Sequence, residues 1–194
     1  MRWDRPPLHE VAVTLPGWVA GAVDFDATYA TDEARMRLAI RLARENIRRG
    51  TGGPFGAAVF ERGTGRLVAV GMNGVVRLNN STAHAEMLAL QLAERRIASY
   101  SLAADGHPAH ELFSSCAPCA MCLGAVLWSG VTRLVCGAAR EDAERVRFDE
   151  GPVFAESYAY LRARGIEIAE RVLRDEARAV LDEYAAMGGE VYNG

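Results

Sequence analysis

The chain contains no lysine: all 22 of its basic residues are arginine. This absence excludes a Schiff-base lysine, and with it pyridoxal chemistry, as well as the Walker-A phosphate loop. No apolar run approaches the ~18–20 residues that cross a membrane. Residues 1–7 also lack the apolar segment of a secretory signal peptide. We therefore expect a cytoplasmic protein with no membrane partner.

The sequence has no excess of positive charge. It has 22 basic and 25 acidic residues, a net charge of -3 and a pI of about 5.8. Proteins dedicated to nucleic acids usually carry a basic excess, because phosphate contacts dominate their affinity. This charge balance argues against a nucleic-acid partner, although it does not exclude a local basic patch.

Cysteine is scarce, with only four residues in a chain of 194. The composition, 50% hydrophobic and 24% charged, is that of an ordinary globular domain and excludes disorder, collagen-like repeats and a disulfide scaffold. Three of the cysteines, Cys116, Cys119 and Cys122, fall within seven residues, and Cys136 stands apart. In a cytosolic protein such a cluster is more often metal-binding or catalytic than disulfide-linked.

We expect residues 1–30 to form an irregular arm and residues 31–194 to form one domain. Thr31 is the predicted N-cap of a helix that Gly50 ends. After a hairpin, strands and helices mostly alternate, which favours an α/β fold with helices on both faces of a sheet. The expected strands are 55–61, 66–73, 110–115, 131–138 and 165–169, the expected helices are 31–49, 83–99, 118–128 and 174–187, a polar loop is expected at 74–82, and short helices are expected within 141–163.

Two short motifs carry recognisable chemistry, and 31 residues (87–117) separate them. The first is His84-Ala85-Glu86 and the second is Pro118-Cys119-Ala120-Met121-Cys122. An H-x-E motif followed by P-C-x-x-C is a signature of zinc-dependent nucleobase deaminases. The intervening segment is long enough for a helix, a turn and a strand.

The spacing within each motif predicts that both lie at helix starts. Cys119 and Cys122 are three residues apart and share one helix face. His84 and Glu86 would point roughly 200° apart on a helix body, so they converge only at its open N-terminal end. Two helix N-termini facing one point favour thiolates and a bound hydroxide. One histidine and two cysteines leave a fourth zinc position for water, as in a catalytic site.

Other residues compete for these roles. Cys116 has the same spacing to Cys119, but it precedes the proline, and we expect it at a strand end away from the helix face. Cysteines can also be merely buried small hydrophobes, an interpretation that the flanking motifs disfavour. The remaining histidines, His9, His107 and His110, have no such context and are expected on the surface. We predict one zinc ion per chain, held by His84, Cys119 and Cys122.

The chain resembles the cytidine deaminase-like zinc hydrolases, and within them the bacterial guanine deaminases. The resemblance runs from about residue 34 to the C-terminus. It implies a three-layer α/β/α sandwich around a five-stranded mixed sheet, usually in a homodimer whose C-terminal segment can reach the partner's active site. The residues that carry it are 53–59 (GPFGAAV), 71–73 (GMN), 83–86 (AHAE), 118–125 (PCAMCLGA), Trp128 and 148–152 (FDEGP).

The resemblance also implies roles for single residues. Glu86 would be the proton shuttle, and water would attack C2 of guanine to give xanthine and ammonia. Asn73 would hydrogen-bond the purine ring, and Glu150 would contact guanine and assist proton transfer. Phe55 and Trp128 would supply apolar walls, for which plain core packing is the alternative.

Two positions leave questions open. Ala117 stands where the family often has glutamate directly before Pro-Cys, which puts the fine specificity in doubt but not the metal ligands. Either Tyr184 or Tyr192 could be the residue of the C-terminal tail that contacts a site.

The alternatives to a guanine substrate share the same chemistry. They are deamination of guanosine, cytosine or an aminotriazine, and of adenosine in tRNA, which the charge balance disfavours. A zinc-stabilised interaction module without catalysis is a further alternative, but it would have no use for Glu86.

Overall fold

A computed structural model describes residues 10–192 of the chain. Within them, the strands form one five-stranded sheet in the order β2-β1-β3-β4-β5. Strand β1 pairs antiparallel with both β2 and β3, whereas β3, β4 and β5 run parallel, so the sheet is mixed as expected. The strands are β1 (Gly56–Glu61), β2 (Leu67–Met72), β3 (His110–Cys116), β4 (Arg133–Ala138) and β5 (Glu167–Ala169).

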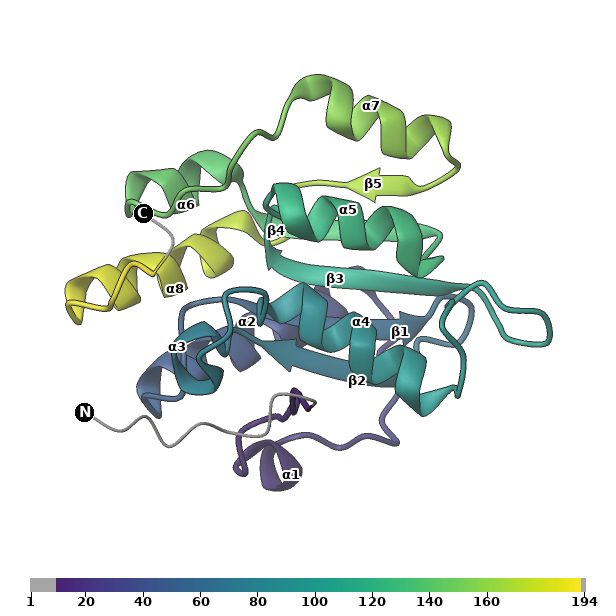
Figure 1. The fold of residues 1–194 in the computed structure, drawn as a ribbon, viewed down its shortest axis with the longest axis horizontal. Coiled ribbons are helices and arrows are strands. Elements are labelled where there is room, and N and C mark those ends of the chain that lie inside the picture. The colour runs from purple at the N-terminus through teal and green to yellow at the C-terminus, as the bar shows by residue number, and fades with distance from the viewer. Residues whose placement is uncertain (1–9, 193–194) are drawn as a thin grey trace.

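Helices cover both faces of this sheet and enclose two hydrophobic cores (Figure 1). Neighbouring residues of a strand point to opposite faces, so in β3 Phe113 packs into one core and Leu112 into the other. The three-layer α/β/α architecture expected from the sequence is confirmed. One core contains α2 (Asp32–Arg48), α6 (Arg140–Arg145) and α8 (Arg174–Ala186), and the other contains α4 (Ala85–Arg96), α5 (Ala120–Ser129) and α7 (Ala155–Ala163).

Local signals place several element ends correctly and others wrongly. Thr31 caps α2, because its side chain accepts a hydrogen bond from the backbone N–H of Ala34 at 3.2 Å. The loop expected at 74–82 instead contains a short helix, α3 (Val75–Leu78). Helix α5 begins two residues after Pro118, at Ala120. No helix among residues 10–192 combines the length and the apolar character that a membrane span requires.

The expectation that His110 is a surface residue is wrong. It is the first residue of β3, the central strand, and it is buried with its Nδ1 2.7 Å from the carbonyl oxygen of Leu102. Helix and sheet packing around β3 removed it from solvent, which no local pattern could show. His107 is exposed, and His9 lies outside the described residues.

Residues 10–30 lie against the domain. They contain the short helix α1 (Val19–Ala22), and Val19 is buried in the core that contains α2 and α8. Thr28 forms a bridge to Arg66 just before β2. Trp18 donates a hydrogen bond from its ring Nε1 to the Thr51 hydroxyl at 3.1 Å. The domain boundary at residue 30 stays a prediction.

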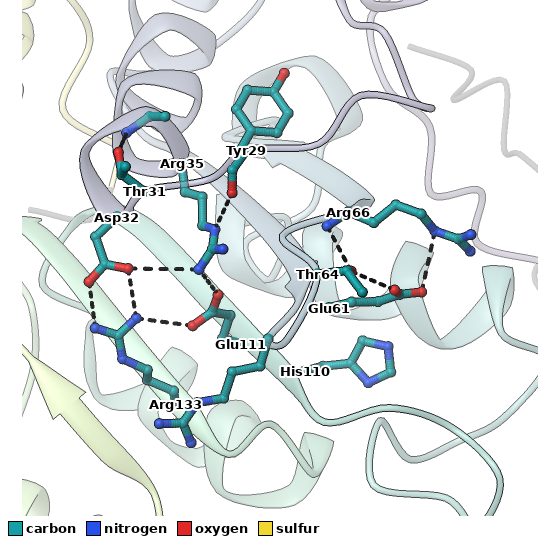
Figure 2. Close-up of polar contacts among 12 residues, drawn as sticks. Tyr29, Thr31, Asp32, Arg35, Glu61, Thr64, Arg66, His110, Glu111 and Arg133 are labelled. Carbon is teal, nitrogen blue, oxygen red and sulfur yellow. Dashed lines mark hydrogen bonds and ion pairs between the residues drawn. The ribbon is translucent and has the colours of Figure 1, made fainter.

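An ion-pair cluster ties α2 to the first residues of β3 and β4 (Figure 2). The carboxylate of Glu111, fully buried, accepts hydrogen bonds from Arg35 and, at 3.0 Å, from Arg133. Arg133 also binds both carboxylate oxygens of Asp32 and reaches Glu167. The Arg133 hydrogen bond holds the pKa of Asp32 below its usual value. Two guanidinium groups thus compensate one carboxylate that has no access to water.

Removing a charge from this cluster should make the folded chain less stable. We expect Glu111→Gln to lower the free energy of unfolding by about 3 kcal/mol, because loss of one partner leaves a buried charge uncompensated. Urea denaturation followed by circular dichroism measures the change. The matched control is Glu167→Gln, at the half-exposed partner of the same arginine, for which less than about 1 kcal/mol is expected. Equal losses in the two variants would contradict the interpretation.

Candidate active site

Four strand ends meet at one edge of the sheet, and the candidate site lies there. The cross-strand partners are Gly56 and Met72, Ala57 and Ser114, and Cys116 and Ala138. The chain therefore enters β1 and leaves β2, β3 and β4 at the same edge. Residues adjoining these ends, although distant in sequence, come together because of the strand directions.

His84, Cys119 and Cys122 converge at this edge. His84 and Cys119 occupy the N-cap positions of α4 and α5, and Cys122 lies in the first turn of α5. The Nδ1 atom of His84 is 3.6 Å from the sulfur of Cys119 and 3.7 Å from that of Cys122. The three ligand atoms lie within 4.8 Å of one another. Both helix N-termini face this point, as the spacing predicts.

This group fits a zinc ion. Zinc at about 2.3 Å from sulfur and about 2.0–2.1 Å from nitrogen, with a tetrahedral angle, places the two ligand atoms about 3.6 Å apart. The observed separations match this value. A hydrogen bond from Cys122 and then the His84 ring lower the pKa of the Cys119 thiol to about 4, which favours the thiolate that binds metal. The chemistry of the donors and their spacing are those of a three-ligand zinc site.

Cys116 is not part of this group. It is the last residue of β3, as expected, and its sulfur lies 3.8 Å from the carbonyl oxygen of Ala139. Burial raises the pKa of its thiol well above the ordinary value. Cys116 is excluded by position, since it is not among the three residues whose ligand atoms lie within 4.8 Å of one another.

Glu86 lies directly beside the cysteine sulfurs. Its Oε1 accepts a hydrogen bond from the Ser114 hydroxyl at 2.9 Å, and its Oε2 is 3.5 Å from the sulfur of Cys122. Burial, followed by the charge of Cys119, raises the pKa of this carboxyl. A carboxyl held beside the metal ligands in this way can serve as a general acid or base.

Glu150 approaches the same point from the loop that follows α6. Phe148, two residues before Glu150, is buried in the core, and the backbone N–H of Ala120 donates to the Glu150 carbonyl at 3.0 Å. These two contacts hold the loop across the start of α5. Burial, and then the charges of Cys119 and Glu86, raise the pKa of the Glu150 carboxyl to about 8. Two carboxyl groups with raised pKa therefore share one site.

Asn73 and Tyr192 add unpaired polar atoms. Asn73 follows β2, and its Oδ1 accepts a hydrogen bond from the backbone N–H of Val75 at 3.3 Å. Its Nδ2 and the Tyr192 hydroxyl are buried with no hydrogen-bond partner. Buried polar groups are rarely left unpaired, and both residues line one pocket, where the Asn73 side chain also lies close enough to act on the Tyr192 hydroxyl.

These side chains line one small pocket. Its cavity volume is about 10 Å³, close to the space that one water molecule needs. Of the expected site residues, only Cys122, whose sulfur contacts the lining residues His84 and Glu86, and Trp128 are not in its lining. The lining residues are Phe55, Asn73, His84, Glu86, Ala117, Cys119, Glu150 and Tyr192.

Trp128 does not lie in this pocket. It lies near the end of α5, nine residues after Cys119, and its side chain is 80% exposed. A helix rises about 1.5 Å per residue, so Trp128 is about 13 Å from the helix end that carries the site. The expectation that it walls the pocket of its own chain is not supported. Phe55, by contrast, lines the pocket and packs edge-on against Phe148, with the ring centroids 4.9 Å apart.

Sequence reasoning missed one residue and left one choice open. Ser114, which holds Glu86, was not singled out, although a polar residue near the end of a buried strand leading into Pro-Cys was a usable signal. Of the two tyrosines, Tyr192 lines the pocket, whereas Tyr184 stacks on Phe148 with its ring 6.1 Å away. The C-terminal tail therefore contacts the site of its own chain. Its reach to a partner subunit stays a prediction.

Comparison with known proteins agrees with this site. The family model described as "Cytidine and deoxycytidylate deaminase zinc-binding region" matches residues 29–138. The chain belongs to this family. The guanine deaminase of Bacillus subtilis (strain 168) is 36% identical over 124 residues, covering 64% of this chain and 75% of that protein. The tRNA-specific adenosine deaminase of Buchnera aphidicola subsp. Schizaphis graminum is 32% identical over 132 residues, covering 68% and 79%.

Structural similarity extends over nearly the whole chain. The solved structure of a guanine deaminase from Nitrosomonas europaea superposes with a TM-score of 0.88 and 47% sequence identity, covering 92% of this chain and 97% of that one. The similarity therefore includes most of the chain beyond residue 138, where Glu150 lies. The resemblance to zinc deaminases that the two motifs indicated is confirmed.

Metal analysis tests the ligand assignment. We expect about one equivalent of zinc per chain in the purified protein, and its loss in His84→Ala, Cys119→Ser and Cys122→Ser. Cys116→Ser is the matched control and should keep its metal, because that sulfur lies outside the ligand group. Loss of zinc from Cys116→Ser with retention by Cys122→Ser would show that the assignment is wrong.

Proposed function

We propose that this protein is a zinc-dependent aminohydrolase that converts guanine and water into xanthine and ammonia. The observation that carries the proposal is the meeting of Glu150 and Asn73 with the His84, Cys119 and Cys122 group in one buried pocket. A carboxyl group, which can accept a hydrogen bond, and an amide donor suit a ring that presents both N–H groups and a carbonyl. The similarity to two guanine deaminases supports the same substrate.

Glu86 is positioned to move the protons of the reaction. A zinc ion held by the three ligands would supply a nucleophile for C2, because zinc makes water acidic enough to ionise near neutral pH. Glu86 takes the proton that water loses and delivers it to a ring nitrogen. The Ser114 hydroxyl fixes one carboxylate oxygen, and the other lies 3.5 Å from the Cys122 sulfur, on the side of the metal ligands.

Glu150 acts on the departing amine from another side of the pocket. Its carboxyl accepts a hydrogen bond from the ring or its amino group and passes a proton to the leaving nitrogen. Burial, the largest cause of its raised pKa, favours the protonated form of this carboxyl, which can then give a proton to the amine. Asn73, with an Nδ2 that lacks a partner, donates to an acceptor on the purine.

Tyr192 must move for a purine to enter. The cavity of about 10 Å³ holds one water at most, and Tyr192 packs against Phe148 with ring centroids 5.2 Å apart. The tail thus covers the pocket in the free protein and would close again over the base. Covering the base excludes bulk water and strengthens the electrostatic contacts inside.

An ammonia-release assay over a panel of bases and nucleosides tests the proposed substrate. Guanine should be the best natural purine, and adenine should be poor. Guanosine should be poor as well, because the tail that carries Tyr192 could not close over a base that bears a ribose. Comparable turnover of guanosine would mean a nucleoside deaminase, and turnover of tRNA adenosine would favour the activity named for the Buchnera relative.

Variants of the two carboxylates test their separate roles. We expect Glu86→Gln and Glu150→Gln each to lower kcat about 10²–10⁴-fold with zinc retained, since positioned acid–base catalysis contributes this much. Guanine should bind weakly without the Glu150 carboxylate but still bind without that of Glu86. Glu156→Gln, at an exposed acid in α7, is the control. Wild-type turnover by Glu150→Gln would refute its role.

We propose further that the protein is a cytoplasmic homodimer. Leu127 and the exposed Tyr160 line an apolar groove of about 480 Å³ between α5 and α7, and Trp128, next to Leu127 in the chain, is also exposed. Exposed apolar patches mark interfaces. All four cysteines are free, which suits a reducing compartment. We expect light scattering to give twice the chain mass of 21.0 kDa, and Trp128→Glu to lower it. A wild-type monomer would exclude the dimer.

A further inference from the structure

Asn46 does not line the pocket, but it connects two backbone segments that lead into the wall of the pocket. It lies near the C-terminal end of α2 and is fully buried. Its amide Nδ2 donates one hydrogen bond to the carbonyl of Gly53 at 2.9 Å and another to the carbonyl of Asn73 at 2.8 Å. Both donor hydrogens of one side chain are therefore used to hold two backbone segments together.

The close approach of these segments depends on Gly52. A Cβ atom at this position would lie 1.9 Å from the carbonyl oxygen of Asn73 and 2.7 Å from the Nδ2 of Asn46. Only glycine leaves the space for such contact. The backbone N–H of Asn73 also donates to the carbonyl of Phe55 at 3.0 Å. The turn before β1 and the end of β2 are thus held in one fixed relation.

A hydrogen-bonded relay continues from Asn46 to the N-terminal segment. The Thr51 hydroxyl donates to the Oδ1 of Asn46 at 2.7 Å, which fixes which way the amide points. The same hydroxyl accepts the hydrogen bond from the Trp18 ring. Trp18 is further held by the guanidinium of Arg49, 5.3 Å from its ring centroid. The relay runs Trp18, Thr51, Asn46 and then the backbone of Asn73.

We propose that Asn46 is a positioning residue for purine binding, and that Trp18 and Thr51 keep its amide in the working orientation. Asn46 touches no reacting atom. It fixes the backbone from which Asn73 aims its Nδ2 and sets the distance from Asn73 to Phe55 across the pocket. The inference rests on the proposed function only in that Asn73 and Phe55 contact the base.

Steady-state kinetics of Asn46→Ala tests the role. The base used is whichever the wild-type enzyme turns over best, so a substrate other than guanine would refute the proposed function and leave this test intact. We expect KM to rise about tenfold while kcat stays within about threefold. The zinc ligands, Glu86 and Glu150 come from other elements, so the zinc content should not change.

A matched control separates positioning from general loss of stability. Ser129→Ala removes another buried side chain, whose hydroxyl donates to the carbonyl of Val126 at 3.0 Å at the far end of α5. It should lower the melting temperature without changing KM. If Asn46→Ala fails to fold, Thr51→Val replaces it, because this variant keeps Asn46 and removes only the hydroxyl that orients it. A smaller rise in KM, about threefold, is then expected.

A double-mutant cycle gives the decisive result. If Asn46 acts through Asn73, the variant carrying both Asn46→Ala and Asn73→Ala should have the KM of Asn73→Ala alone, within about twofold. If Asn46→Ala does not fold, the cycle is run with Thr51→Val. Fully additive effects on KM, or a folded Asn46→Ala or Thr51→Val with wild-type KM, would overturn the proposal.

Discussion

The antiparallel pairing of β1 with both β2 and β3, next to the parallel pairing of β3 with β4, is the constraint on which the site depends. It puts the ends of β2, β3 and β4 and the start of β1 at a single sheet edge. Helices α4 and α5 both begin there, and so their N-cap residues, His84 and Cys119, can share one metal ion. If β3 and β4 ran in opposite directions, the loop bearing Glu150 would leave the sheet at the other edge.

Without a metal ion, the charged groups at this edge of the sheet repel one another and destabilise the site. Two cysteine sulfurs and the carboxyl groups of Glu86 and Glu150 are crowded together in a buried space, and burial and mutual repulsion raise the pKa of both carboxyls. A divalent cation relieves the repulsion and keeps the thiolates ionised. The metal ligands and the two carboxyls are therefore coupled, because a cation bound by the three ligands also acts on the ionisation of Glu86 and Glu150.

Stability and binding are supported at different places. The buried Glu111 is held by Arg35 and Arg133 (Figure 2). It lies at the opposite end of β3 from the site, because it is the second residue of that strand and Cys116 is the last. Asn46, in contrast, supports the pocket edge through backbone carbonyls alone. Helix α2 contributes to both, since Arg35 lies near its start and Asn46 near its end.

Local sequence by itself determined the helix starts at His84 and Cys119, the cap at Thr31 and the alternation that makes an α/β sheet. These depend on nearest neighbours and on residue spacing. The metal ligands could also be predicted from the sequence, because the spacing of residues at a helix start fixes the directions of their side chains. Resemblance to known proteins supplied Asn73, Phe55 and Glu150, whose placement no spacing rule could give.

Only the tertiary structure decided the rest. The exposure of Trp128, the burial of His110, the choice of Tyr192 over Tyr184 and the role of Asn46 all depend on contacts between residues far apart in the chain. Trp128 has the apolar character of a pocket residue, but the length of α5 carries it away from the site. Asn46 looks like an ordinary helix residue until β1 and β2 place two backbone carbonyls beside it. Such contacts are set by packing of whole elements, which local sequence does not encode.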